Sequence, residues 1–133
     1  MSLLTCLVVM LGGALGSLAR YALSSLTADY SRELPLATIG INMTGSFLIG
    51  FFGTLTLAHG RYPVSENLRL FVMVGLCGGY TTFSSFSLQT LTLAEDGEWF
   101  KAGANCILSF ALCLLGVWFG HIVAVQVNGM KGH

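Results

Sequence analysis

Four long apolar stretches limit what this chain can fold into more than any other feature of its sequence. They cover residues 2–26, 36–58, 68–94 and 99–125. An α-helix needs roughly 20 apolar residues to cross the hydrocarbon core of a bilayer, and each stretch is that long. Only 9% of the residues are charged, whereas soluble domains carry about 25%. We therefore predict an all-α, multi-pass membrane protein in which residues 1–133 form a single four-helix transmembrane domain. Nothing is left over for a soluble catalytic domain, so we predict no enzymatic activity.

The third stretch holds small and polar residues where a helix in lipid usually has Leu or Val. It contains Gly75-Leu76-Cys77-Gly78-Gly79-Tyr80-Thr81-Thr82-Phe83-Ser84-Ser85-Phe86-Ser87. The adjacent Gly78 and Gly79 favour unwinding, because each Gly costs roughly 1 kcal/mol relative to Ala inside a helix. A glycine-rich packing seam is the alternative, but the hydroxyl residues after the glycines favour a break in the middle of the membrane. Unwound backbone at that depth needs protein or a water-filled cavity around it, and such breaks often form ion sites.

The acidic residues all lie in predicted loops or at the ends of the apolar stretches. They are Asp29, Glu33, Glu66, Glu95, Asp96 and Glu98. A proton-coupled exchanger normally has an ionisable group inside the membrane, so their placement favours a passive pathway. The net charge is zero, which gives no electrostatic footprint for a nucleic-acid partner.

The basic residues show no preference for one side of the membrane. With four spans, one side holds Arg61, Arg69 and Lys131, and the other holds Arg20, Arg32 and Lys101. A Lys/Arg bias is what sets the orientation of a membrane protein. We therefore predict insertion in both directions and an antiparallel homodimer, unless folding or other cues fix one orientation.

Two polar residues inside the stretches have two interpretations each. Asn42 lies on a small, polar face of the second stretch, together with Thr38 and Ser46. It either holds two helices together or offers its N–H donors to a passing anion, since polar groups at this depth face a bundle interior or a cavity. Arg20 either extends to the membrane interface or attracts anions at a vestibule.

The cysteines and histidines show no metal-binding pattern. Cys6, Cys77, Cys106 and Cys113 lie inside apolar stretches, without a CxxC or His-spaced arrangement, and we interpret them as small buried hydrophobic residues. The three histidines lie near segment ends or at the terminus, where we interpret them as interfacial residues.

Taken together, three motifs resemble the Fluc/CrcB family of small fluoride channels. The first is Gly12-Gly13-x-x-Gly16-Ser17-x-x-Arg20-Tyr21, the second is Gly40-x-Asn42-x-x-Gly45-x-Phe47-x-x-Gly50, and the third is Gly75-x-x-Gly78-Gly79-x-Thr81-Thr82-Phe83-Ser84-Ser85-Phe86-Ser87. The resemblance implies passive fluoride efflux through two pores of an antiparallel dimer, with one structural sodium ion on the dimer axis. The fourth stretch matches only in its general character.

The resemblance also implies roles for individual residues. It implies that Asn42 donates to fluoride and that Phe83 and Phe86 present ring edges, which hold the positive part of the aromatic quadrupole. Backbone carbonyls of Gly78 and Thr81 from each chain would hold the sodium ion. The further polar residues expected along the pore are Thr38, Ser84, Ser85, Asn105 and Ser109. The chain departs from the family in having Gln89 where an acid often comes after the third motif.

Two other functions are less consistent with the sequence than a fluoride channel. A small multidrug-resistance-type proton-coupled exporter needs a Glu in its first span, and residues 2–26 contain no carboxylate. A non-transporting scaffold subunit would need the small-residue packing motifs but few buried hydroxyls and no Asn42. We expect a location in the cell membrane among lipids, in the inner membrane of a bacterium.

Overall fold

The computed structural model describes residues 2–129, and all regular elements in that range are helices. The four segments long and apolar enough to cross a membrane are Leu3–Leu26, Leu36–Leu55, Glu66–Glu95 and Trp99–Asn128. This confirms the predicted all-α, multi-pass membrane architecture. Lys131, which enters the charge comparison, and the terminal His133 lie outside the described residues.

Three of the spans are single helices, whereas the third is a series of short elements. Helix α1 (Leu3–Leu26), α2 (Leu36–Leu55) and α6 (Trp99–Asn128) form spans one, two and four, and a 3-10 turn η1 (Ala28–Ser31) comes after α1. The third span consists of α3 (Glu66–Arg69), the π-helix η2 (Leu70–Cys77), α4 (Gly78–Tyr80) and α5 (Phe83–Glu95). In a π-helix each N–H bonds five residues back instead of four, an arrangement that is rare and often found at functional sites.

The second span ends at Leu55, earlier than predicted, and the fourth continues to Asn128, beyond its predicted end. The side chain of Asn128, at the end of α6, joins these two ends. The side-chain amide of Asn128 donates to the carbonyl oxygens of Thr54 at 3.2 Å and Leu55 at 3.3 Å. Arg69 donates to the carbonyl of Gly53 at 3.1 Å. The last carbonyls of a helix have no partner inside it, so these side chains stabilise the end of α2 where the sequence pattern alone shows no stop.

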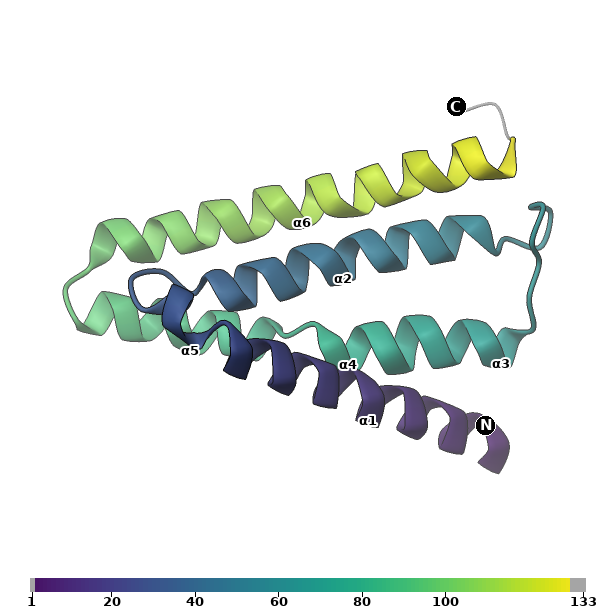
Figure 1. The fold of residues 1–133 in the computed structure, drawn as a ribbon, viewed down its shortest axis with the longest axis horizontal. Coiled ribbons are helices and arrows are strands. Elements are labelled where there is room, and N and C mark those ends of the chain that lie inside the picture. Colours follow the sequence, from purple (N-terminus) through teal and green to yellow (C-terminus); the bar gives the residue numbers. More distant parts are fainter. Residues whose placement is uncertain (1, 130–133) are drawn as a thin grey trace.

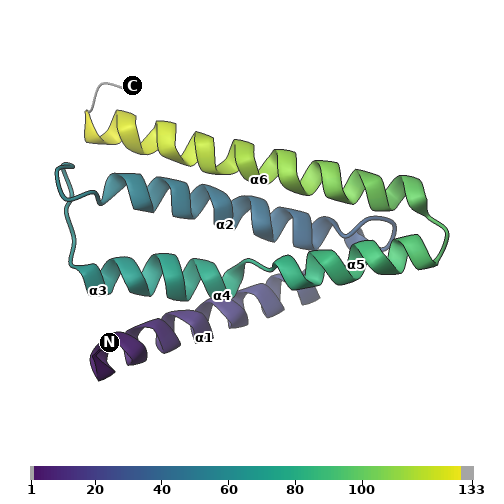
Figure 2. The ribbon, with the colours of Figure 1, turned by 180° about the vertical axis from the view of Figure 1, so that it is seen from behind.

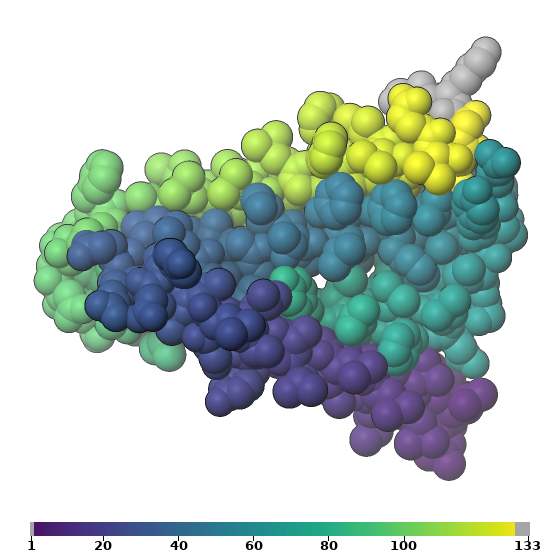
Figure 3. Space-filling model, in the orientation of Figure 1, coloured from purple at the N-terminus to yellow at the C-terminus, as the bar shows by residue number. Residues whose placement is uncertain are grey.

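The spans form two pairs of neighbours, α2 with α6 and α1 with the third span, and the two members of each pair run the same way (Figure 1). α2 and α6 lie side by side and run the same way, and the third span runs the opposite way on the other side of α2 (Figures 1 and 2). α1 crosses the third span, against which it packs along η2 and α4. The space-filling view shows α1, in purple, along the lower edge of the molecule (Figure 3).

Glycines allow the closest approaches between these neighbours. A β-carbon at Gly16 of α1 would collide with the Leu76 carbonyl oxygen, and one at Gly79 of α4 would collide with the Gly13 carbonyl oxygen. Gly120 of α6 meets the backbone of Phe47 on α2 in the same way. Small residues at such spacing let helix backbones come together in lipid, where packing rather than water drives association. The glycines of the first motif therefore serve close packing of α1 against the third span.

We predict that Gly16→Ala lowers the stability of the folded protein in detergent by about 1–3 kcal/mol, the usual cost of adding a methyl group to a tightly packed site. Its control is Gly103→Ala, because a β-carbon at Gly103 has nothing within 4 Å. That change should be neutral or stabilising by up to about 1 kcal/mol. Unfolding followed by tryptophan fluorescence measures both. Equal stability of the two variants would contradict close packing at Gly16.

Candidate functional site

The third span breaks between α4 and α5, and two residues there have extended backbone. Thr81 has φ −78° and ψ 157°, and Thr82 has φ −152° and ψ 111°. The predicted break of the third span is therefore confirmed within the stretch 75–87 and ahead of Phe83, but the unwound residues are Thr81 and Thr82, whereas Gly78 and Gly79 remain helical within α4. The physical reason is that Gly79 faces the backbone of α1 and so serves packing instead of unwinding.

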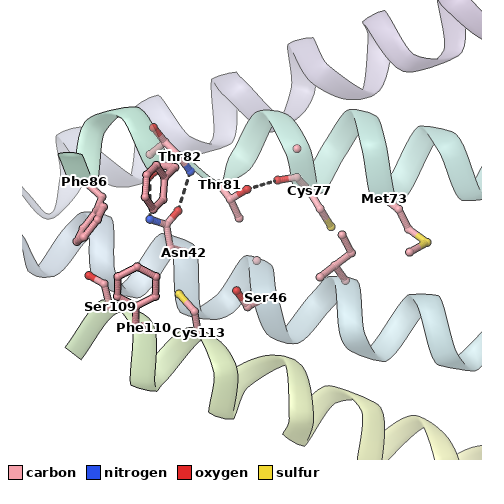
Figure 4. A pocket seen from close by; sticks show the side chains of 14 residues that line it. Asn42, Ser46, Met73, Cys77, Thr81, Thr82, Phe86, Ser109, Phe110 and Cys113 are labelled. Atoms are coloured by element: carbon pink, nitrogen blue, oxygen red, sulfur yellow. Dashed lines mark hydrogen bonds between the residues drawn. The ribbon is translucent and has the colours of Figure 1, made fainter. Parts of the chain in front are cut away.

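Asn42 of α2 bonds both backbone groups of Thr82, and Figure 4 draws the one between the Asn42 oxygen and the Thr82 N–H. Its amide nitrogen donates to the Thr82 carbonyl at 2.9 Å, and its side-chain oxygen accepts from the Thr82 N–H at 2.7 Å. In a continuous α-helix that N–H would bond the Gly78 carbonyl, so the Asn42 contact replaces a main-chain bond. The structure thus shows the interhelical contact that was one interpretation of Asn42. An amide has two N–H donors, and one of them remains beyond this contact.

The new helix start is capped by Thr82 itself. The Thr82 hydroxyl oxygen accepts from the Ser85 N–H at 3.1 Å, which is an N-cap bond. The same hydroxyl lies 3.0 Å from the Ser85 hydroxyl and 3.3 Å from that of Ser84. In an uninterrupted helix the Ser85 N–H would bond the Thr81 carbonyl. The carbonyls of Thr81 and Gly78, predicted as sodium ligands, have therefore both lost their usual helical donors.

α1 supports the other side of the break. The Arg20 Nε donates to the Gly79 carbonyl at 3.1 Å, and the Ser17 hydroxyl lies 3.5 Å from the same oxygen. A cation is favourable at this point because the C-terminal end of a helix carries partial negative charge. Arg20 thus holds the end of α4, a contact that neither interpretation from the sequence included.

A cavity of about 290 Å³ opens beside the break, between α2, the third span and α6 (Figure 4). Its fourteen lining residues are Asn42, Gly45, Ser46, Ile49, Met73, Cys77, Gly78, Thr81, Thr82, Phe83, Phe86, Ser109, Phe110 and Cys113. The structure therefore brings six predicted site residues together, namely Asn42, Gly78, Thr81, Phe83, Phe86 and Ser109. None of the fourteen is charged, so the cavity offers hydrogen-bond donors and aromatic rings but no ionised group.

Three aromatic rings form one wall of the cavity. The ring centroids of Phe83 and Phe86 lie 5.2 Å apart, and those of Phe86 and Phe110 lie 5.9 Å apart with an interplanar angle of 80°. Phe86 is only 6% exposed, whereas Phe83 is 68% exposed on the outside of this chain. Phe110 was not predicted from the sequence, because nothing in its local pattern distinguishes it from the other apolar residues of α6.

The remaining predicted polar residues lie outside the cavity lining. Asn105 is completely buried and donates to the Thr90 hydroxyl at 2.8 Å, and its oxygen lies 3.4 Å from the Ser109 hydroxyl. Asn105 therefore links α5 to α6 and also contacts Ser109, which lines the cavity. Thr38 is buried on α2, and Ser84 and Ser85 surround the Thr82 cap.

Some lining residues were not identified from the sequence as site residues. Thr82 had a detectable signal, because a Thr three residues before Ser85 at the start of a helix is a typical N-cap. Cys77 and Cys113 were interpreted as buried hydrophobic residues, yet both line the cavity, and Ser46 lines it as well. Gln89 lies instead beside a separate hollow that Arg32 also lines.

Comparison with known proteins places these features in a family. The sequence model described as "CrcB-like protein, Camphor Resistance (CrcB)" matches residues 7–121. A protein of Methylobacterium radiotolerans named "Fluoride-specific ion channel FluC" is 64% identical over 129 residues, covering 97% of this chain and 90% of its own. A protein of Gluconobacter oxydans with the same name is 63% identical, with 96% and 90% coverage. A third, from Methylocella silvestris, is 57% identical, with 93% and 95% coverage.

We predict that Asn42→Ala loosens the break, because both backbone groups of Thr82 lose their partner. Each unsatisfied buried group costs about 1–3 kcal/mol. Hydrogen–deuterium exchange, read by mass spectrometry on peptides that span the break, should therefore become faster. Ser46→Ala is the control, since Ser46 lines the same cavity from the same helix and should leave the exchange unchanged. Unaltered protection in Asn42→Ala would contradict the proposed support of Thr82.

Proposed function

The chain belongs to the CrcB-like family, and from that premise we propose that it is a channel through which fluoride crosses the membrane passively. Transport instead of catalysis is also what the names of its relatives describe. The observation that carries the proposal is the uncharged cavity at the break, where Asn42, Ser109 and the rings of Phe83 and Phe86 meet. Neither alternative function is favoured by a comparable observation.

Fluoride needs substitutes for its water shell along such a pathway. Moving a small ion into a medium of low dielectric constant costs of order 20 kcal/mol in the idealised limit. The remaining N–H of Asn42 supplies a conventional donor, and the Ser109 hydroxyl supplies a second one once it leaves its long 3.4 Å bond to the Asn105 oxygen. The edges of Phe83 and Phe86 supply weaker positive charge. The N-terminal end of α5 adds the positive end of a helix dipole beside the cavity. All of these groups favour an anion, and none of them binds a proton near neutral pH.

We propose in addition that the working unit is an antiparallel dimer with two pores and a central sodium ion. The balanced basic residues remove the usual reason for a fixed orientation. Phe83 lines the cavity and is nevertheless 68% exposed, so a second copy would cover it. The carbonyls of Gly78 and Thr81 have lost their helical donors, and hard cations prefer oxygen ligands. Two such carbonyls from each chain would surround one sodium ion with four oxygens.

We predict that liposomes containing the protein release fluoride and retain chloride. A fluoride electrode and a chloride electrode, used on matched vesicles with valinomycin to balance charge, measure the two fluxes. The larger, less strongly hydrated chloride fits these donors poorly. Equal leakage of both ions would reject the proposed selectivity.

The matched variant for this assay is Asn42→Asp. A carboxylate offers no donor and repels an anion, so fluoride flux should fall by about tenfold or more, which corresponds to about 1.4 kcal/mol in the barrier. Its thermal unfolding in detergent should be compared with that of the unchanged protein. Undiminished flux in a folded Asn42→Asp protein would remove Asn42 from the pathway.

We predict that a label placed in the second loop reports both orientations. Pro63 is exposed in that loop, and Pro63→Cys, with the native cysteines changed to serine, is suited to a membrane-impermeant maleimide. In sealed vesicles about half of the chains should react from outside, because neither orientation is favoured by charge.

The same protein, after desalting, should retain one sodium ion for every two chains by elemental analysis. Uniform labelling from one side would reject the antiparallel dimer, and a protein free of sodium would reject the central ion.

A further inference from the structure

A second side-chain contact joins α2 to the break, outside the lining of the cavity. The hydroxyl of Tyr80, the last residue of α4, lies 2.9 Å from the hydroxyl of Thr44 on α2, and neither residue lines the cavity. A hydroxyl has one proton to donate, and the Thr44 proton goes to the Gly40 carbonyl at 2.8 Å. The Tyr80 hydroxyl is therefore the donor to Thr44.

Thr44 and Asn42 hold the break from opposite flanks of α2. Residues two positions apart are about 200° apart around an α-helix, which has 3.6 residues per turn. Gly45 faces the break between these flanks, since a β-carbon there would collide with the Thr81 side chain and lie 3.1 Å from the Tyr80 ring. The chain at the break therefore rests on Gly45 with one bonded side chain on each flank, and the bonds together oppose its rotation about α2.

The two contacts bear on the direction of the Thr81 carbonyl. In a trans peptide the carbonyl and the next N–H lie in one plane and point in opposite directions. The Thr82 N–H points to the Asn42 oxygen on α2 at 2.7 Å, so the Thr81 carbonyl points away from α2. Asn42 holds this peptide through its N–H, and Tyr80 is the residue just before Thr81. A rotation of the backbone at Tyr80 would turn the carbonyl in another direction.

Packing within the chain leaves the Tyr80 side chain room to move. A hollow of about 350 Å³ lies beside it, lined mostly by apolar residues of α1 and α2 as well as by Tyr80 and Thr44. Because this side of the ring borders open space, the bond to Thr44 contributes to its position beyond what packing supplies.

We propose that Tyr80 is a positioning residue for the ion pathway, because its bond to Thr44 fixes the direction of the Thr81 carbonyl from the flank opposite Asn42. The functional half of this inference rests on the proposed fluoride channel and its central sodium ion. A hard cation depends on the placement of its oxygen ligands. Losing the Tyr80 bond should therefore weaken sodium binding and, through it, fluoride conduction.

Hydrogen–deuterium exchange on peptides that cover residues 78–86 tests the contact itself. Tyr80→Phe should speed exchange there by roughly threefold to tenfold, the effect of losing one hydrogen bond. Thr44→Val should also speed it, and the double variant should exchange no faster than Thr44→Val alone, because both changes remove one contact. Thr44→Ser keeps the hydroxyl, and Tyr30→Phe removes a tyrosine hydroxyl beside the same hollow, so both should match the unchanged protein. Unaltered exchange in Tyr80→Phe, or additive effects in the double variant, would overturn the inference.

The functional half is tested in liposomes prepared at low and at high sodium concentration, with a melting curve for each variant. At low sodium Tyr80→Phe should release fluoride roughly threefold to tenfold more slowly than the unchanged protein. High sodium should restore its rate, whereas Asn42→Asp should not recover. Recovery in a variant that is fully folded at the assay temperature is a result that a role in folding alone would not give.

An unchanged rate in Tyr80→Phe, or a loss that sodium does not reverse, would overturn the positioning role. If exchange changes as expected but no preparation releases fluoride, the unchanged protein included, the contact between Tyr80 and Thr44 is supported and the proposed function is rejected.

Discussion

A peptide group released from a helix inside a membrane has no water to bond, and this constraint governs the centre of the molecule. Each unsatisfied group there costs several kcal/mol. At the break, a single side chain, Asn42, supplies both a donor and an acceptor to Thr82. Because that contact takes the N–H that a helix would give to Gly78, it lets the span separate into two half-helices. The cavity exists where those halves part.

The break is held from two sides, so the cavity depends on the packing of the whole bundle. On one side α2 contributes Asn42 and also Gly45, where a β-carbon would collide with the side chain of Thr81. On the other side α1 contributes Arg20, which bonds the Gly79 carbonyl. Glycine contacts between α1 and the third span fix the distance over which Arg20 can reach. Packing motifs and polar contacts are therefore parts of one arrangement.

The sequence predicted the four spans and a break in the third, because both depend on local composition. It did not show that the glycine pair stays helical, because two glycines equally permit unwinding and close packing, and only the position of α1 decides that Gly79 packs. It identified Asn42 as exceptional without finding its partner, since Thr82 lies 40 residues away in the chain. It also treated Cys77 and Cys113 as core residues, because hydrophobicity does not reveal which side of a helix borders a cavity.

The π-helix η2 gives the two halves of the third span unequal tolerance to changes in chain length. Its bonds reach back five residues instead of four, so it stores an extra residue ahead of the break. Losing one residue there would let the segment revert to α-helix while the capped α5 keeps its register. Losing one residue from the start of α5 would rotate the remainder of that helix by about 100°, since a turn contains 3.6 residues, and would carry Phe86 off the cavity wall. Over evolutionary time, insertions and deletions in this span should therefore accumulate on the η2 side.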